Sequence, residues 1–153
     1  MTSFTTRGRT ITESDIVQFA ALTGDWHPQH ADAAWAQERP FGERIAHGML
    51  VLSYAIGLAP IDPERVIALR RVREVTFKRP VRLGDTIHVE GSVGERKPID
   101  DASELAVWTW SVVNQHGRTV LRATIEAVQR RDADADGAAE RPALEAVAGV
   151  VPL

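Results

Sequence analysis

The sequence predicts a single α+β domain in which a curled antiparallel sheet of about five strands wraps one buried helix. Short helix patterns fill the first third of the chain, and the segment from His47 to Ala59 is apolar on every side. After Pro63, β-branched residues alternate with charged ones. With 153 residues, 44% hydrophobic and 25% charged, the chain is long enough for one domain with a real core.

The first helix is expected over residues 13–22. Thr12 precedes an acidic first turn, and apolar residues then follow at helical spacing. Gly24 is suited to end this helix, and Pro28 prevents it from continuing because proline lacks an N–H group. Residues 25–30 are therefore predicted to form a loop.

Two more helices are expected before the sheet begins. Residues 31–38 contain strong helix formers and no helix breaker. Residues 47–59 are apolar around the whole circumference, which predicts a helix surrounded by other structure, and Pro60 ends it.

Four long strands follow, expected at residues 65–81, 85–93, 104–113 and 118–129. In the second of them Ile87 and Val89 should face the core while His88 faces outward. Residues 114–117 predict a hairpin turn, and residues 4–9 an extra edge strand.

A sheet that wraps one apolar helix is the outline of a hot-dog fold. The exposed edge of such a sheet is protected when a second copy pairs with it, so the sequence predicts a homodimer. This domain is expected to cover residues 1–131. Residues 132–153 lack aromatic residues and periodicity, which predicts a flexible C-terminal tail whose last apolar residues either stay free or dock on a groove.

Composition excludes several classes of function. The net charge is −3 and basic residues are scattered, so nucleic acid is not an expected partner. The absence of cysteine excludes thiolate chemistry. The N-terminus lacks the apolar core of a signal peptide, and the uncharged stretch from His47 to Ile61 is shorter than the about 20 apolar residues that span a bilayer. We therefore expect a cytoplasmic protein.

Two segments contain the residues of chemical interest. Residues 24–32 read GDWHPQHAD and residues 41–50 read FGERIAHGML. They resemble the signature of MaoC-like dehydratases and (R)-specific enoyl-CoA hydratases. The similarity continues through FKRPV at residues 77–81 and LGD at residues 83–85, over roughly residues 12–130 in all.

The resemblance implies reversible syn hydration of a trans-2-enoyl thioester to a (3R)-3-hydroxyacyl thioester, with no metal or redox cofactor. Asp25 would take the proton from water that attacks C3, while His30 orients this water and handles the proton delivered to C2. The N–H of Gly48 would stabilise charge on the thioester oxygen, because helix N-termini present free N–H groups. In the alternative interpretation, Gly48 only relieves crowding at a turn.

The chain departs from the family at one position of the first motif. The usual Asp-x-Asn-Pro-x-His is Asp-x-His-Pro-x-His here, so His27 replaces an asparagine. Either His27 preserves a hydrogen bond that fixes the loop, or it changes the charge beside Asp25. A metal site formed by His27, His30 and Asp32 is disfavoured, because Pro28 prevents the helical geometry of a zinc motif.

Further substrate contacts are expected around Asp25 and His30. Trp26 lies between the motif residues, and His47 should make a hydrogen bond at the helix entry rather than transfer a proton. Ser53 either reaches the pocket or bonds its own helix backbone. Met49 either lines an acyl tunnel or fills the core.

Thioester substrates bring an anionic carrier, either coenzyme A or the phosphopantetheine of an acyl carrier protein. Lys78 and Arg79 are the candidate contacts to its phosphate, although charged strand residues also serve solubility. Two other functions remain open: a hot-dog thioesterase, and a non-catalytic subunit that binds an acyl thioester or its carrier. The acyl group belongs to fatty acid or polyketide metabolism, and the sequence favours neither.

Overall fold

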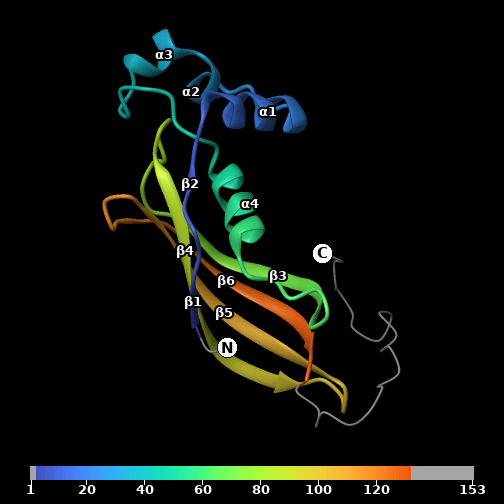
Figure 1. Cartoon of the computed structure of the whole chain (residues 1–153). Helices are drawn as coiled ribbons and strands as arrows, with labels where there is room; N and C mark the ends of the chain where they lie inside the picture. The colour runs from blue at the N-terminus through green and yellow to red at the C-terminus, as the bar shows by residue number, and fades with distance from the viewer. Residues whose placement is uncertain (1–2, 132–153) are drawn as a thin grey trace.

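The computed structural model describes residues 3–131, which form one curled antiparallel sheet and a set of helices (Figure 1). The helices are α1 Glu13–Thr23, α2 Pro28–Ala31, α3 Ala33–Gln37 and α4 Gly48–Leu58. The strands are β1 Ser3–Thr5, β2 Arg9–Thr10, β3 Val66–Phe77, β4 Thr86–Pro98, β5 Ser103–Asn114 and β6 Thr119–Arg130. The predicted C-terminal tail lies outside the described residues.

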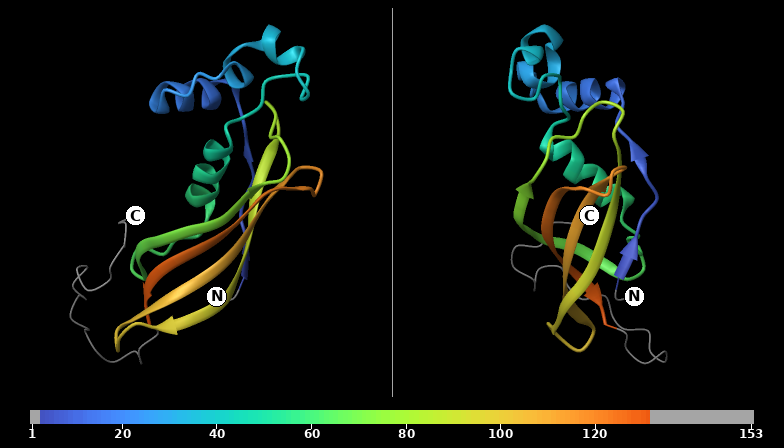
Figure 2. Two further views of the ribbon diagram at one scale, coloured as in Figure 1. Left: turned by 180° about the vertical axis from the view of Figure 1, so that it is seen from behind. Right: turned by 90° about the vertical axis from the view of Figure 1, so that its left-hand side faces the viewer.

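The sheet has the strand order β1-β4-β5-β6-β3, and β2 also pairs with β4. All pairings are antiparallel, and the long ladders join β4 to β5, β5 to β6 and β6 to β3. The sheet curls around α4, while α1, α2 and α3 lie beyond one end of the sheet, where α4 begins (Figures 1 and 2). This confirms the predicted hot-dog arrangement, and β3 forms one of its open edges.

The face of α4 that meets the sheet makes the centre of the core. Leu50, Val51, Leu52 and Ala55 are buried there among apolar residues of β4, β5 and β6. The opposite side of the helix is open: Met49 is 55% exposed, and Ser53 and Gly57 are exposed too. The prediction that structure surrounds this helix on every side is therefore wrong for a single chain, because one sheet covers only one side.

Helix α1 is fixed at both ends as the sequence predicts. Thr12 and Asp15 form a capping box, and Gly24 ends the helix in the left-handed conformation with φ of 78°. The Tyr54 hydroxyl of α4 donates to Asp15 over 2.6 Å and ties the two helices together. Burial would raise the pKa of Asp15, but hydrogen bonds from Tyr54, Thr12 and Arg9 outweigh it and hold the pKa at about 2.

Several boundaries differ from the prediction: β4 continues to Pro98 rather than ending at residue 93, and the helix expected over residues 31–38 is interrupted at Asp32, between α2 and α3. Two other differences have reasons in local chemistry. Gly24 has already ended α1, and Pro28 begins α2 instead of only preventing a helix, because the first position of a helix needs no N–H donor. The expected loop over residues 25–30 is therefore wrong from residue 28 onward. Strand β3 ends at Phe77 rather than at Val81, since Pro80 cannot donate to the ladder. None of the described helices has the length and hydropathy needed to cross a bilayer.

Candidate functional site

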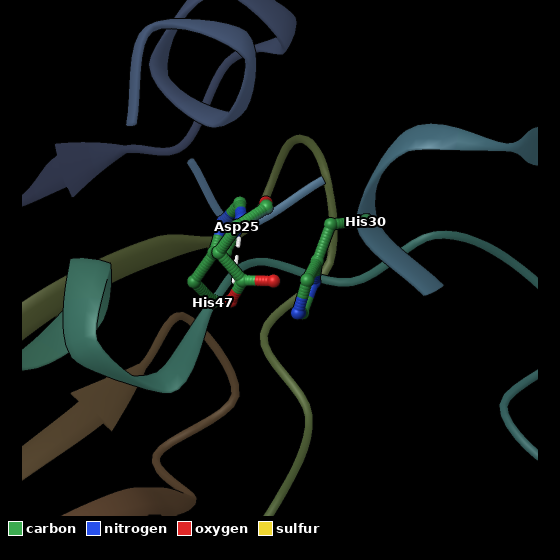
Figure 3. Close-up of side chains that lie close together, drawn as sticks. All are labelled: Asp25, His30 and His47. Carbon is green, nitrogen blue, oxygen red and sulfur yellow. Dashed lines mark hydrogen bonds and ion pairs between the residues drawn. The ribbon is translucent and has the colours of Figure 1, made fainter. Parts of the chain in front are cut away.

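Three side chains from separate segments meet where the small helices join α4. Asp25 follows the end of α1, His30 lies in α2, and His47 directly precedes α4. One carboxylate oxygen and one nitrogen from each ring lie within 4.8 Å of one another (Figure 3). The N–H of His27 donates to Oδ1 of Asp25 over 3.3 Å, which restrains the carboxylate.

The position of the proton on His30 follows from its backbone contact. Nδ1 lies 2.7 Å from the carbonyl oxygen of Ile45, an acceptor, so Nδ1 is the nitrogen that donates. Burial lowers the pKa of His30 from its ordinary value, and the neighbouring rings of His47 and His27 lower it further. The Ile45 bond and the charge of Asp25 raise the pKa without outweighing burial. His30 is thus a neutral imidazole at neutral pH whose Nε2 can accept a proton.

The buried side chain of His47 packs against both Asp25 and His30. It is 2% exposed, and its ring stacks on His30 with centroids 3.9 Å apart. Its Nε2 donates to the backbone carbonyl of Asp25 over 3.0 Å and lies 4.0 Å from the carboxylate of Asp25. His47 thus makes a hydrogen bond at the helix entry, as predicted, but its partner is the carbonyl of Asp25, and its side chain does not cap α4. His47 therefore positions both Asp25 and His30.

His27 takes the role of a helix cap. Its Nδ1 accepts the N–H of Gln29 over 3.1 Å at the start of α2. Its ring also packs edge-on against Trp35 with centroids 5.6 Å apart. Asparagine is itself a preferred N-cap residue, so the structure supports the interpretation that His27 preserves a loop-fixing hydrogen bond.

Because His27 caps α2, the substitutions His27→Asn and His27→Ala should have different effects on stability. His27→Asn keeps an acceptor for Gln29 and should leave the free energy of unfolding almost unchanged. His27→Ala removes the acceptor and should lower it by about 1 kcal/mol. Urea unfolding of both variants measures the difference, and equal losses in the two would show that the ring rather than the cap matters.

A pocket of about 420 Å³ opens beside this cluster, within the usual size range of ligand sites. Its lining includes His30, Gly48, Met49 and Phe77. The first-turn N–H groups of α4 have no intrahelical acceptor, and no side chain caps them. A Cβ atom at position 48 would lie 2.6 Å from the Phe77 ring, so glycine here also makes room for that ring.

The other predicted contacts divide between the pocket and its surroundings. Lys78 and Arg79 line the pocket together with Met49, whose exposure of 55% excludes the core-filling alternative. Ser53 donates to the carbonyl of Met49 over 2.7 Å, which confirms the bond to its own helix backbone. Trp26 is 53% exposed and is not among the residues that line the pocket.

The three clustered side chains also have the composition of a metal site, but their orientation does not favour one. Ligand lone pairs of imidazole lie in the ring plane, and the rings of His30 and His47 are stacked at only 26° to each other. Their lone pairs thus run side by side rather than toward one ion. The set considered from sequence is not assembled either, since His27 caps α2 and Asp32 caps α3.

A second pocket, of about 220 Å³, lies at the other end of α4 and is lined mainly by apolar residues, including Ile56, Trp108 and Trp110. It is the more enclosed cavity, but it contains no imidazole and none of the predicted site residues. We therefore place the chemistry in the pocket that contains His30.

The second motif marks His47 as a candidate site residue, but the sequence does not show that its side chain contacts Asp25. His47 stands beside Gly48 in the second motif, 22 positions after Asp25, and only the folded chain brings the two together. The sequence does not predict Phe77 in the site, because Phe77 lies at the end of β3 and meets Gly48 only through the tertiary fold.

Comparison with known proteins identifies the family to which the chain belongs. The family model described as "MaoC like domain" matches residues 2–115. The chain is 46% identical over 90 residues to protein MaoC of Klebsiella aerogenes, covering 57% of this chain and 26% of that protein. It is 34% identical over 118 residues to the (R)-specific enoyl-CoA hydratase of Aeromonas caviae, covering 75% of this chain and 82% of the hydratase.

Solved structures agree in fold. The monoamine oxidase regulatory protein from Archaeoglobus superposes with a TM-score of 0.80 at 39% identity, covering 86% of this chain and 90% of that one. Several curated relatives are longer than the matched region: the chain spans 26% of the Klebsiella protein and 61% and 65% of two further relatives.

Proposed function

Because the chain belongs to the MaoC-like domain family, we propose that it is a hydro-lyase that interconverts a trans-2-enoyl thioester and a (3R)-3-hydroxyacyl thioester. The observation that carries the proposal is the convergence of Asp25 and His30 beside the uncapped start of α4. Similar proteins named (R)-specific enoyl-CoA hydratase and 3-hydroxybutyryl-CoA dehydratase support the same reaction class.

The spacing of the two acceptors suits one water molecule. Hydrogen bonds of about 2.8 Å from both hydrogens of a water reach acceptors that lie about 4 to 5 Å apart. The ligand atoms of Asp25 and His30 lie within 4.8 Å of each other. A water held between them presents its oxygen lone pair to C3 of the enoyl group.

The tautomer of His30 favours a division of roles that differs from the one expected from the sequence. Water oxygen bonds to C3 while one O–H bond breaks and its proton moves to Nε2 of His30. The electron pair of the C2–C3 double bond shifts to form an enolate on the thioester oxygen. Nε2 then returns the proton to C2, so the sum is one water added, while Asp25 orients this water and stabilises the transient imidazolium.

The enolate needs a donor already aimed at its oxygen. The N–H of Gly48 is the first of α4, and both Gly48 and His30 line the same pocket. The partial positive charge of the helix N-terminus adds to this effect. Since the base that accepts the proton also returns it on the same side of the substrate, the addition is syn.

The neutral state of His30 leads to a pH prediction. His30 must be unprotonated to accept a proton, and burial lowers its pKa. The kcat/KM for hydration should therefore stay constant as the pH is lowered from neutrality. It should fall only below a pH of about 6.5, which is the ordinary pKa of histidine. A pH profile measured with crotonyl-CoA tests this, and an acid limb centred above that value would contradict the role of His30 as base.

The direct assay is incubation of the pure protein with crotonyl-CoA while the absorbance of the conjugated thioester is followed. Loss of absorbance without release of free thiol supports hydration. Thiol release detected by a trapping dye would instead identify a thioesterase, and binding without turnover at any chain length would identify a non-catalytic subunit.

We further propose that the active form is a homodimer. Among residues 3–131, no strand pairs with the outer edge of β3, and such edges pair readily. The outer side of α4, where the apolar side chain of Met49 is 55% exposed, is not covered by any other part of residues 3–131. Sedimentation equilibrium is expected to give twice the mass of one chain, and a monomer at all concentrations would contradict the proposal.

A further inference from the structure

Two basic side chains stand at the rim of the pocket that contains the proposed catalytic pair. Lys78 and Arg79 directly follow β3 and line this pocket together with His30 and Gly48. Both are exposed, whereas His30 and Gly48 are partly buried, so the basic residues lie toward solvent. Their backbone N–H groups both donate to the carbonyl of Val120, over 2.8 Å and 3.2 Å, which anchors the segment to β6.

The charge of these two residues is not compensated by any acid in the part of the chain that the structure describes. The guanidinium of Arg79 donates to the backbone carbonyl of Thr119 over 2.6 Å, and the ammonium of Lys78 makes no hydrogen bond or ion pair with any residue in the range 3–131. Basic residues elsewhere nearby are neutralised: Arg82 pairs with Glu43, Arg44 with Glu13, and Arg73 with Glu126. The pocket rim therefore keeps an uncompensated positive pair.

The pocket lining offers a surface for each part of a carrier thioester. The thioester carbonyl would lie at Gly48, the Phe77 ring lies against Gly48, and the apolar side chains of Met49 and Pro80 line the same pocket. A pantetheine arm that extends from the thioester along these side chains ends in a phosphate. Lysine binds phosphate as a compact charge, and arginine binds it through a fork of donors.

We propose that Lys78 and Arg79 bind the phosphate at the end of the pantetheine arm, a group shared by coenzyme A and acyl carrier proteins. This inference rests on the proposed function for the position of the thioester. It assigns the two residues to affinity rather than to chemistry, because they contact neither the reacting carbons nor the water.

The test compares three crotonyl thioesters that differ only in the carrier: coenzyme A, 4′-phosphopantetheine and pantetheine without phosphate. The double variant Lys78→Met/Arg79→Met should raise KM about tenfold or more for the first two and leave kcat unchanged. KM for crotonyl-pantetheine should stay within about twofold of wild type, because it carries no phosphate. Added salt should raise KM for the phosphate-bearing thioesters in wild type and much less in the variant.

Arg122→Met is the matched control, because Arg122 is also exposed, lies on the neighbouring strand β6 and does not line the pocket. An equal KM change in this control would overturn the inference, as would an equal change for crotonyl-pantetheine. A rise in KM for crotonyl-CoA alone would show that Lys78 and Arg79 contact the nucleotide part of coenzyme A. This result would overturn the assignment of the two residues to the phosphate of the pantetheine arm. If wild type hydrates none of the three thioesters, the proposed function fails, and calorimetric titration with coenzyme A then decides whether these residues bind phosphate.

Discussion

Replacing His30 by alanine is expected to lower kcat for crotonyl-CoA hydration by about 10²- to 10⁴-fold. The substitution removes the only neutral base that the cluster of Asp25, His30 and His47 presents to the pocket. Asp25→Asn keeps the shape of the side chain and an oxygen for the His27 N–H, but it loses the charge that stabilises the imidazolium. A loss of similar size is expected from it.

The two effects should not add. If Asp25 and His30 act on one water, the double variant should be hardly slower than the worse single variant. Steady-state kinetics with all three variants measures this, and unfolding curves show whether each remains folded. His88→Ala is the matched control, because His88 lies on the outer side of β4 and contacts Glu90 rather than the site. Full activity in both Asp25→Asn and His30→Ala would contradict the assigned site.

Removing the N–H of residue 48 is expected to lower kcat by about 10²- to 10³-fold, the effect of losing an oxyanion donor. Proline achieves this with little change in the backbone. It is well tolerated at the first position of a helix, and the preceding residue, His47, already has the extended ψ of 135° that proline requires.

The experiment needs a steric control, because any side chain at position 48 meets the Phe77 ring. Gly48→Ala introduces the Cβ atom but keeps the N–H. In a Phe77→Ala background the clash is removed, so Gly48→Pro should be far slower than Gly48→Ala. Equal activities of the two variants in that background would show that glycine is needed only for space and that the amide has no role in the reaction.

Much of the fold could be predicted because it depends on local pattern. The Thr12 cap, the Gly24 stop and the alternation around Ile87 and Val89 act within a few residues, and the structure confirms them. The apolar run that forms α4 was equally plain. The open side of that helix was not, because the pattern shows which residues are apolar and not how many layers are present to cover them.

The site was only partly predictable. Asp25 and His30 meet because one turn and one short helix join them, which sequence spacing reveals. The tautomer of His30 depends on the carbonyl of Ile45, and the position of Asp25 depends on His47. These contacts arise when α4 packs against the small helices, so no local pattern contains them. The start of α2 at Pro28 does not follow from the sequence pattern, because a proline can either break a helix or occupy its first position.

Hydration of crotonyl-CoA by the pure protein in deuterium oxide tests most directly whether one cluster both takes and returns the proton. With Asp25 and His30 on a single side of the substrate, we expect a (3R)-hydroxybutyryl product with deuterium at C2 on the same face as the new hydroxyl. Deuterium on the opposite face, a (3S) product or no hydration at all would contradict it.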